Sequence, residues 1–376
     1  MPAIDQSTIA QVPNGENLRG SLKLTHDPNA TDQYQRKSDS KIGEWKGFGK
    51  GPIATPGVLA WPPVRIPFPL LASSARPFDV VGLGQNSVDL LAVVNGFPRS
   101  NTKHRLERFT QLPGGQIATS MVCCARLGWR ARYVGRFGSD ELGRFGLESL
   151  RGEGVDVSAS KAVEARTRTA IVLVDSRTGD RTVLWDRDPA LAIRPGDVEP
   201  DVWASARALH VDCEDIAAAT EGARIAREHG VLTLIDVEAV LPGVPALLRH
   251  IDVIVASEGF PQRLTGHQDT GTALAAMARE YAPVVACVTL GSAGSLAICQ
   301  GREIRTPAFD VPVVDSTGAG DAFRGGFLSG YFAAGADADV ADVLTYATAV
   351  AGLKCRSLGA RDGLPRTSDV EQFLRR

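Results

Sequence analysis

The stretch Asp315-Ser-Thr-Gly-Ala-Gly-Asp321 continues directly into the apolar run Ala322-Phe-Arg-Gly-Gly-Phe-Leu328. Three small residues, Gly318, Ala319 and Gly320, leave the backbone uncovered where this helical run begins. The first N–H groups of a helix have no partner inside it, and the helix dipole adds positive potential at the same end. A turn of this kind is therefore suited to holding a phosphate group.

The acidic side chain of Asp321 lies beside this turn. Because a carboxylate repels a phosphate, we expect Asp321 to accept the proton of a hydroxyl group that attacks the phosphate. The alternative is an ordinary turn and helix cap, in which Asp321 only complements the helix dipole. Gly325, Gly326 and Gly330 favour the first interpretation, because a glycine inside a helix costs roughly 1 kcal/mol relative to alanine. We expect this helix to pack closely against a sheet or a nucleotide, after a buried strand at residues 309–314.

The block from Asp315 to Phe327 resembles the second signature of the ribokinase-like (PfkB) carbohydrate and nucleoside kinases. The resemblance covers residues 78–372. It implies that the backbone of Gly318, Ala319 and Gly320 forms an anion hole and that Asp321 is the catalytic base. It also implies two cofactors, ATP and Mg²⁺.

The composition of the chain agrees with a soluble enzyme. Its 376 residues are 44% hydrophobic, and the formal net charge is -2. No apolar run is long enough to span a membrane, and the charge balance gives no reason to expect a nucleic-acid partner. The six cysteines show no Cys-x-x-Cys spacing and lie in or beside apolar runs, which predicts free thiols in a cytoplasmic protein and no zinc site.

The chain divides near residue 77. Residues 1–77 are polar, rich in proline and without hydrophobic periodicity, so we expect a largely disordered extension whose end can drape over the domain. This extension lacks the charged start and the continuous apolar core of a signal peptide. From residue 78 to residue 372, short β-branched runs alternate with alanine-rich helical runs. That alternation predicts a three-layer α/β/α sandwich with a mostly parallel central sheet.

Individual elements of this sandwich can be placed along the sequence. The predicted strands begin at Val80, Arg132, Ala208, Leu232, Val253 and Val284, and the predicted helices span 117–127, 217–228 and 272–281. Two regions, 92–112 and 168–187, break the alternation and are typical of antiparallel strands joined by turns. The resemblance implies that they form a small β lid over the sugar, and that the protein is a possible homodimer through this lid.

Several residues near the ends of predicted strands are implied to bind the sugar. The implied substrate set is Asp89, Gly114, Gly115, Thr119, Arg187 and Asp212. Asp89 would accept hydrogen bonds from sugar hydroxyls, although a helix cap or a turn is the alternative. Thr119 departs from the family pattern, which normally has an asparagine that touches the sugar. Arg187 and Asp212 lie in short matches to ketohexokinases. A dinucleotide site at Gly82-Leu-Gly84 is a further alternative, but the third glycine and the closing acidic residue are missing.

Two loops are implied to bind ATP. The loop Thr289-Leu-Gly-Ser-Ala-Gly294 resembles the one that approaches the phosphates, and it is also consistent with a hairpin turn. Residues 351–365 resemble the loop that borders adenine and, in many members, a monovalent cation such as K⁺; a plain C-terminal helix and turn is the alternative. The implied ATP set is Thr289, Gly291, Gly294, Thr317, Gly318, Lys354 and Cys355, and the implied monovalent-cation set is Asp315 and Gly359.

The acidic Mg²⁺ motif of the family, Asn-x-x-Glu, is not kept in this chain. Ser257 and Phe260 occupy its two positions, so we assign Mg²⁺ to Asp236, Glu238 and Glu258 instead. The sequence therefore predicts ATP-dependent phosphorylation of a hydroxyl group on a sugar, a ketose or a related carbohydrate. The alternatives are a nucleoside kinase, a regulatory protein that kept the fold without turnover, and a dehydrogenase that binds a nicotinamide cofactor.

Overall fold

The computed structural model describes residues 62–178 and 181–375. The prediction of disorder for residues 1–61 lies outside these residues. The remainder of the predicted extension, residues 62–77, packs on the domain. Val64 and Ile66 are buried, the N–H of Ile66 donates to the Ala338 carbonyl at 3.0 Å, and the N–H of Val340 donates to the Val64 carbonyl at 2.9 Å.

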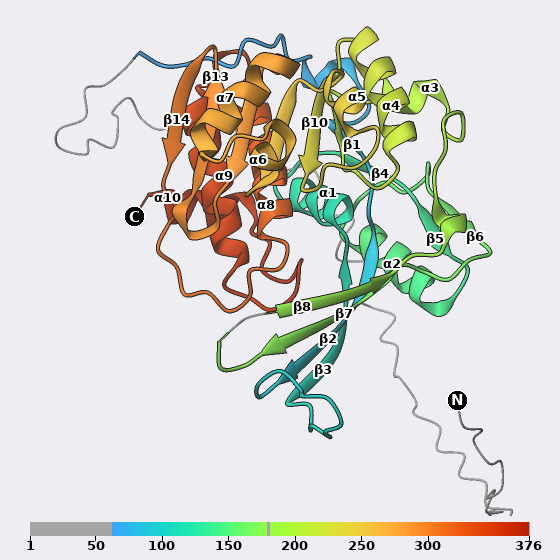
Figure 1. Ribbon diagram of the computed structural model, residues 1–376. Coiled ribbons are helices and arrows are strands. Elements are labelled where there is room, and N and C mark those ends of the chain that lie inside the picture. Colours follow the sequence, from blue (N-terminus) through green and yellow to red (C-terminus); the bar gives the residue numbers. More distant parts are fainter. Residues whose placement is uncertain (1–61, 179–180, 376) are drawn as a thin grey trace, which may run out of the picture. The chain divides into compact units, whose positions relative to one another are not determined.

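A central sheet of eight strands organises the domain (Figure 1). In sheet order the strands are β14 (Arg302–Thr306), β13 (Ser295–Cys299), β12 (Val285–Thr289), β11 (Val253–Ser257), β10 (Leu232–Val237), β9 (Ala208–Val211), β1 (Val80–Leu83) and β4 (Ala131–Val134). The strands from β12 to β4 are parallel, and β13 and β14 are antiparallel to their neighbours. Each predicted strand of the parallel part is confirmed to within two residues of its predicted start.

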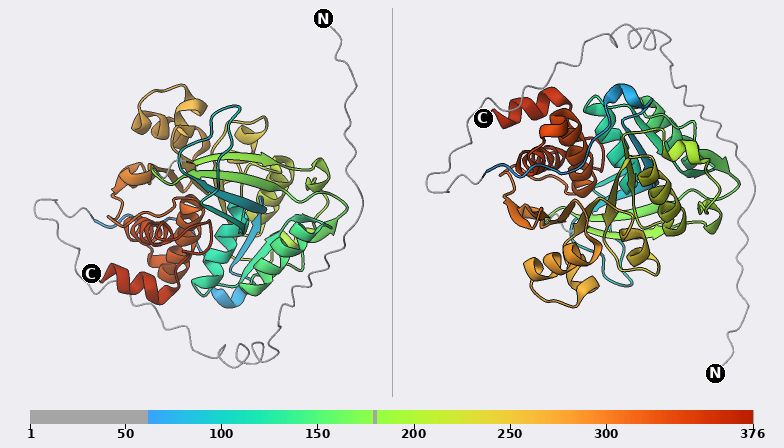
Figure 2. Two further views of the ribbon diagram at one scale, coloured as in Figure 1. Left: turned by 90° about the horizontal axis from the view of Figure 1, so that it is seen from below. Right: turned by 90° about the horizontal axis from the view of Figure 1, so that it is seen from above.

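Helices cover both faces of this sheet (Figures 1 and 2). One layer contains α1 (Gln116–Arg126), α8 (Ala319–Ala334), α9 (Val340–Lys354) and α10 (Thr367–Leu374), and the other contains α3 (Pro200–Trp203), α4 (Ile216–Glu228), α5 (Val244–Leu248), α6 (Phe260–Thr265) and α7 (Thr270–Tyr281). Because successive side chains of a strand point to opposite faces, Val80 packs with the first layer and Val81 with the second. The predicted three-layer α/β/α architecture is confirmed.

A second sheet of four strands forms the lid below the central sheet in Figure 1. Its order is β3 (Arg108–Gly114), β2 (Ser87–Val94), β7 (Thr169–Asp175) and β8 (Arg181–Asp186). The lid begins at Ser87, five residues before the predicted start at residue 92. The remaining elements are β5 (Arg136–Gly138), β6 (Lys161–Val163), α2 (Glu141–Gly152) and the short 3-10 helices η1 (Ser73–Ala75), η2 (Pro189–Leu191), η3 (Gly291–Ala293) and η4 (Gly335–Asp337).

The prediction of a buried strand at residues 309–314 is wrong. β14 ends at Thr306, no strand follows it before α8, and Val313 and Val314 are 66% and 55% exposed. Pro312 has no N–H to donate to a neighbouring strand, which disfavours pairing at this position. The apolar run therefore crosses the surface as a connection from the edge of the sheet to the start of α8.

The glycines of α8 have a different neighbour from the one expected. A Cβ atom added to Gly325 would lie 2.7 Å from Cβ of Cys123 on α1, and one added to Gly326 would lie 3.0 Å from Cα of Ala347 on α9. These glycines therefore allow close packing between helices, and they do not themselves make the predicted close approach to the sheet. Contact of this helix with a nucleotide remains a prediction. The prediction of free thiols is confirmed for all six cysteines, which are buried or half-buried.

Candidate functional site

The turn before α8 has the backbone geometry of an anion site. Gly318 is the N-cap of α8 with φ of 76°, and an added Cβ would lie 2.7 Å from the Ala360 carbonyl oxygen. Both the positive φ and the close contact therefore disfavour any residue with a side chain at this position. The N–H of Ala319 donates to the Ser316 carbonyl at 3.1 Å, whereas the N–H groups of Gly318 and Gly320 have no acceptor among the described residues. Two N–H groups are thus free to bind an anion.

Asp321 lies on the first turn of α8, directly after Gly320 in the chain, and is half-buried. Burial raises the pKa of Asp321 well above the ordinary value, and the neighbouring charge of Asp236 raises it further, while Arg324 opposes the shift. Glu238 and Asp212 add smaller contributions in the same direction as Asp236. A carboxylate with a raised pKa is a better proton acceptor, which suits a general base.

Arg324 is the functional neighbour that our sequence reasoning missed. Its Nη2 lies 2.7 Å from Oδ1 of Asp236 and donates to the Val255 carbonyl at 3.0 Å, and both charged side chains are only 2% exposed. A Cβ added to Gly320 would lie 2.6 Å from Nη1 of Arg324, so the glycine also makes room for this side chain. The signal was an arginine inside an apolar helical run, three residues after Asp321.

His210 lies beneath the same turn and cannot carry a proton there. Its Nε2 lies 3.3 Å from Oγ of Ser120, and that hydroxyl donates to the backbone carbonyl of Asp321 at 2.9 Å. Burial, helped by the charge of Arg324, lowers the pKa of His210 to about 3. The imidazole is therefore neutral at physiological pH and positions the start of α8 through Ser120.

Lys354 and Gly359 stabilise the loop that leads into this turn through hydrogen bonds to Asp315. The Asp315 carboxylate accepts the N–H of Thr317 and the N–H of Gly359, both at 2.8 Å, and the Asp315 carbonyl accepts Nζ of Lys354 at 2.8 Å. Burial alone would raise the pKa of Asp315, but the hydrogen bonds from Thr317 and Gly359 hold it below the ordinary value. The Cys355 carbonyl accepts the N–H of Val314 at 2.8 Å.

This arrangement does not fit a monovalent cation at Asp315 and Gly359. Both carboxylate oxygens of Asp315 already accept protein N–H groups, and its carbonyl oxygen already faces an ammonium group. Lys354 is fully buried, and its side chain points to the Asp315 loop, so the amine serves the loop. The assignment of Lys354 and Cys355 to ATP binding remains a prediction.

Asp89 and the first signature meet at the root of the lid. Ser87 Oγ donates to Oδ1 of Asp89 at 2.7 Å, and a Cβ on Gly114 would collide with the Asp89 carboxylate, so the glycine makes space for the acid. Gly115, with φ of 91°, is the N-cap of α1. Burial raises the pKa of Asp89, and the hydrogen bond from Ser87 opposes the shift.

Arg361 comes from the opposite end of the sequence to support this loop. Its Nη2 donates to the Gly114 carbonyl at 2.6 Å, and its Nε donates to Oγ1 of Thr119 at 3.3 Å. Thr119 is fully buried, so its side chain supports Arg361 from within the domain. Burial lowers the pKa of Arg361 to about 10, which still leaves it charged at neutral pH.

Asp212, directly after β9, connects the end of this strand to the segment that follows β1. Its carboxylate accepts the N–H of Gln85 at 2.7 Å and the N–H of Glu214 at 2.9 Å, and a side chain on Gly84 would collide with it. Burial raises the pKa of Asp212 to about 8. Gly84 therefore makes room for Asp212, whereas Gly82 makes room for Ile117 and Met121 of α1. β1 runs into the lid strand β2 with no intervening helix, which excludes the dinucleotide interpretation.

Arg187 belongs to a cluster of charges beside Asp212. Its Nη2 lies 2.9 Å from both carboxylate oxygens of Asp215, and its Nη1 lies 3.3 Å from Glu214. Arg168 Nε lies 3.7 Å from Glu214, beyond hydrogen-bonding distance, and has no hydrogen-bond partner among the described residues. These four side chains line a small pocket with Gln85 and Arg136.

The predicted ATP-phosphate loop lies at the carboxyl end of β12. The loop joins antiparallel strands β12 and β13, so the hairpin interpretation is confirmed. Gly291 and Gly294 have φ of 55° and 88°, and a side chain on Gly294 would collide with the Thr306 carbonyl. Thr289 Oγ1 lies 3.4 Å from the Ala256 carbonyl. The role of this loop in ATP binding remains a prediction.

The three acids assigned to Mg²⁺ are not equivalent. Glu238 and Glu258 are exposed just beyond the ends of the adjacent strands β10 and β11, where a hydrated ion can reach them. Asp236 is buried and paired with Arg324. No cluster of three or more metal-binding side chains is found in residues 62–178 and 181–375. Glu238 and Glu258 thus fit a hydrated ion better than Asp236 does.

The lid reaches the anion site directly. Nη1 of Arg181 at the start of β8 donates to Oγ of Ser316 at 2.6 Å. This contact places a cation beside the turn that begins at Gly318.

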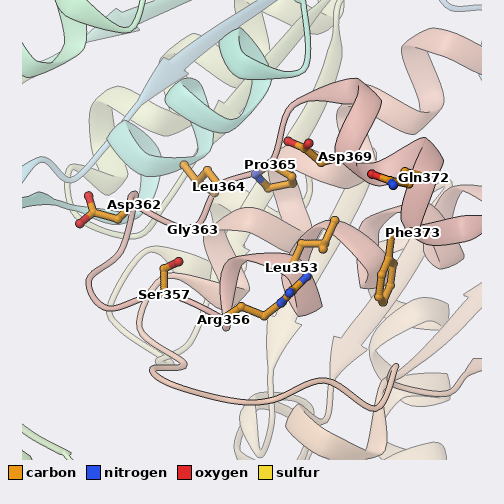
Figure 3. Close-up of a pocket in the computed structure, with 10 residues that line it drawn as sticks. All are labelled: Leu353, Arg356, Ser357, Asp362, Gly363, Leu364, Pro365, Asp369, Gln372 and Phe373. Atoms are coloured by element: carbon orange, nitrogen blue, oxygen red, sulfur yellow. The ribbon is translucent and has the colours of Figure 1, made fainter.

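The hollow in Figure 3 lies elsewhere. Its lining comes from the end of α9, the following loop and α10, namely Leu353, Arg356, Ser357, Asp362, Gly363, Leu364, Pro365, Asp369, Gln372 and Phe373. None of the predicted catalytic, sugar-binding or ATP-binding residues lines it. We therefore place the site at the strand ends and the lid.

Comparison with known proteins identifies the family of the chain. A sequence profile of the pfkB family carbohydrate kinases matches residues 78–367. The chain belongs to this family. It is a carbohydrate kinase with a ribokinase-like fold, and the family resemblance expected from the sequence is confirmed.

Individual relatives span the same part of the chain. A fructokinase from Klebsiella pneumoniae is 32% identical over 78% of this chain and 98% of its own length. A nucleoside kinase from Methanothermobacter thermautotrophicus is 27% identical over 78% of this chain and 95% of its own length. The structure of Arabidopsis thaliana ribokinase complexed with ribose and ATP matches with a TM-score of 0.70 and 25% identity, over 80% of this chain and 99% of that one. Within the described residues, no helix could cross a membrane.

Proposed function

We propose that this kinase transfers the γ-phosphoryl group of ATP to a hydroxyl group of a sugar, with a ketose or a related carbohydrate as the acceptor. The observation that carries the proposal is the position of Asp321 on the first turn of α8, next to the free N–H groups of Gly318 and Gly320. A proton acceptor and an anion site then lie within one helical turn. A phosphoryl transfer requires both at the attacking oxygen and the transferring group.

The residues of the chain divide the work as follows. Asp89, Gly115 and Asp212 position the sugar under the lid. The carboxylate of Asp321 takes the proton of the attacking hydroxyl, and the N–H groups of Gly318 and Gly320 stabilise the charge on the transferring phosphoryl group. Because the transition state of such transfers is loose, positioning and electrostatics supply most of the rate.

ATP is proposed to lie across the β12–β13 loop and the turn before α8. Thr289, Gly291 and Gly294 would approach the phosphates, and Arg181 on the lid adds a cation close to Ser316. Glu238 and Glu258 would hold Mg²⁺ through its water shell, and the ion would neutralise phosphate charge. The similarity of this fold to that of a ribokinase complexed with ribose and ATP supports the assignment of an ATP site.

A nucleoside is the second candidate acceptor, and the nucleoside kinase relative favours it. The higher identity to a fructokinase favours the sugar. A lid-mediated homodimer is also proposed. The outer face of the lid exposes Phe109, Ile171 and Leu184, and a second copy of the lid would cover such an apolar face.

Release of ADP from the purified full chain, with ATP and Mg²⁺, tests the proposed function. The acceptors are ketoses, aldoses, sugar phosphates and nucleosides. Asp321→Asn should lower kcat by roughly 10²–10⁴-fold, the usual contribution of a general base. Asp310→Asn, at an exposed position outside the site, is the matched control and should keep full activity. An Asp321→Asn variant with near-normal kcat would contradict the assignment of the base.

A further inference from the structure

We propose that the loop at residues 212–215 anchors the lid to the domain, and that Glu214 and Asp215 are positioning residues for the phosphoryl transfer. This loop joins β9 to α4 and so belongs to the domain. Its two acids form ion pairs with Arg168 and Arg187 at the root of the lid. The inference rests on the proposed function, because it takes the lid to cover the reacting groups.

The two arginines flank one hairpin of the lid. Arg168 directly precedes β7, and Arg187 directly follows β8. The two strands are antiparallel, with Thr169 opposite Asp186, so both arginines lie where the hairpin meets the domain. Because both pair with acids of the loop at residues 212–215, the ion pairs connect this end of the hairpin to the end of β9.

These ion pairs are largely shielded from water. Nη2 of Arg187 lies 2.9 Å from both carboxylate oxygens of Asp215, and Nη1 lies 3.3 Å from Glu214. Nε of Arg168 lies 3.7 Å from the same Glu214. The four side chains are at most 16% exposed. Salt screens such pairs much less than surface pairs, so they can hold two segments in a fixed geometry.

The cluster is filled by its own side chains. The cavity that it lines together with Gln85 and Arg136 has a volume of only about 10 Å³. That is the space of about one water molecule, so neither a sugar nor a nucleotide fits between these residues. The packing indicates that the cluster holds protein segments together and does not itself bind a substrate.

The same loop also holds the entry to the lid strand β2. The Asp212 carboxylate accepts the N–H of Gln85, two residues before β2, at 2.7 Å, and the N–H of Glu214 at 2.9 Å. Three of the four chain connections between the lid and the domain therefore bind to one loop. The fourth, from β3 to α1, is held by Arg361, which donates to the Gly114 carbonyl at 2.6 Å.

The far end of the hairpin faces the turn before α8. Arg181, at the start of β8, is opposite Val174, and paired residues of neighbouring strands lie on the same face of a sheet. Val174 belongs to the lid cluster against which Leu358 of the domain packs. Nη1 of Arg181 donates to Oγ of Ser316 at 2.6 Å. The lid thus contacts the phosphate turn at the end opposite to its anchor.

The length of β8 makes this contact sensitive to the anchor. Arg181 and Asp186 are the two ends of β8, and five residue steps span about 17 Å in a strand. A tilt of about 5° at the root would therefore move Arg181 by about 1.5 Å. A misplacement of about 1 Å, caused far from the chemistry, can lower the rate about 10²-fold. Acids that fix the root can thus affect the reaction without contact with a substrate.

Trp185 reports on the lid without any need for turnover. Its ring centre lies 5.0 Å from the guanidinium carbon of Arg168, and the residue is 61% exposed, so its surroundings change when Arg168 moves. The full chain is labelled with 5-fluorotryptophan, and Trp185→Phe assigns the lid resonance in the fluorine NMR spectrum. Trp203 is fully buried in the domain, and its resonance is the internal control for an intact fold.

Charge-removing variants test the two acids. Glu214→Gln and Asp215→Asn keep the shape of each side chain but remove its charge. We expect each to move or split the Trp185 resonance, to leave the Trp203 resonance in place, and to lower kcat/KM by ~10–100-fold. The larger change should be in kcat, because the two acids act on geometry and not on binding.

Asp156→Asn is the matched control. Asp156 pairs with Arg132 at 2.8 Å, in a similarly shielded position, and the pair joins β4 to the segment after α2. This variant should lower Tm but leave the Trp185 resonance and kcat/KM unchanged. Should a charge-removing variant fail to fold, Arg187→Lys replaces it. Lysine keeps the charge but cannot contact Asp215 and Glu214 through separate nitrogen atoms, and the same two readouts apply.

The two readouts separate this inference from the proposed function. An unmoved Trp185 resonance in both charge-removing variants would overturn the anchor. A moved resonance with an unchanged kcat/KM would overturn the positioning role. If the wild type phosphorylates no acceptor, the proposed function fails, and the Trp185 resonance alone then supports the anchor by moving or overturns it by staying in place.

Discussion

Replacement of Arg324 by methionine is the most informative perturbation of the site. Methionine keeps much of the length of the side chain but removes its charge and its donors. The substitution leaves Asp236, itself 2% exposed, without its counterion at 2.7 Å, and leaves the Val255 carbonyl without its donor at 3.0 Å. Removing one partner of a buried ion pair costs about 3–5 kcal/mol of stability. For a domain of about 300 residues, with an unfolding entropy of about 2.1 cal/mol/K per residue, that corresponds to a fall in Tm of about 5–8 °C.

The loss of stability should depend on pH. Burial raises the pKa of Asp236 to about 6, and Arg324 opposes that shift. Without Arg324 the pKa of Asp236 rises further, so the carboxyl group stays protonated to higher pH in the variant. Below pH about 6 the group is neutral in both proteins and its electrostatic cost disappears. The difference in stability between wild type and variant should therefore be larger at pH 8 than at pH 5.5.

Urea unfolding, followed by tryptophan fluorescence, measures this difference, and a double-mutant cycle assigns it. Asp236→Asn combined with Arg324→Met removes both charges, so the double variant should lose less stability than the sum of the single variants, by at least about 1.5 kcal/mol. Arg224→Met is the matched control, because its partner Glu228 lies at 2.6 Å on an exposed helix surface. A surface pair of this kind contributes at most about 0.5 kcal/mol.

Two outcomes would refute the reasoning about Arg324. A loss below about 1 kcal/mol would show that the buried pair is not needed to offset the burial of Asp236. Additive single and double variants would show that the two side chains do not interact, whatever their separation.

The remaining predictions concern the base, the braced loop and the lid. Because burial raises the pKa of Asp321, kcat/KM should fall on acidification with a midpoint above 3.8, and a flat pH profile from 5 to 8 together with a midpoint near 3.8 would contradict this. Because the Lys354 ammonium faces the Asp315 carbonyl at 2.8 Å, the rate should not change when tetramethylammonium replaces K⁺. Lys354→Met should lower both activity and Tm. Strong activation of the wild type by K⁺ would contradict the conclusion that a monovalent cation does not fit at Asp315 and Gly359. Because Ile171 and Leu184 are paired on the outer face of the lid and are 44% and 55% exposed, Ile171→Lys should convert a dimer into a monomer in light scattering, and a wild type that is already monomeric would reject the dimer.

The sequence predicts those parts of the molecule that depend on local pattern. The β-branched runs predict the parallel strands because a strand buried on both faces needs continuous apolar residues, whichever strands lie beside it. The turn before Asp321 is predictable for a similar reason, since a phosphate-binding backbone requires small residues at fixed spacing before a helix. The segment 309–314 has the same apolar character but contains Pro312 and finds no partner strand, and its exposure depends on which strand forms the edge of the sheet.

Contacts between distant residues could not be predicted from one sequence. Arg361 and Gly114 are separated by 247 positions, and nothing in either neighbourhood indicates the hydrogen bond between them. Arg324 and Asp236 lie on α8 and β10, and the sequence of neither element indicates that its charged residue pairs with the other. In both cases the sequence shows a charged residue among apolar ones. Such a residue needs a buried polar or charged partner, but the sequence does not indicate which residue that partner is.

Thr119, which departs from the family motif, shows how a distant buried partner changes the interpretation of a motif residue. Considered alone, a threonine in place of the family's asparagine weakens any account of how sugar hydroxyls are bound. In the folded chain Thr119 is fully buried and accepts a hydrogen bond from Arg361, which also donates to the Gly114 carbonyl of the loop beside Asp89. Arg361 keeps its charge at neutral pH, since burial lowers its pKa only to about 10, and its charge favours the ionised form of Asp89. The loss of one amide is therefore accompanied by a cation that supports the same loop from the far end of the chain, so the departure at Thr119 is no argument against a working acceptor site.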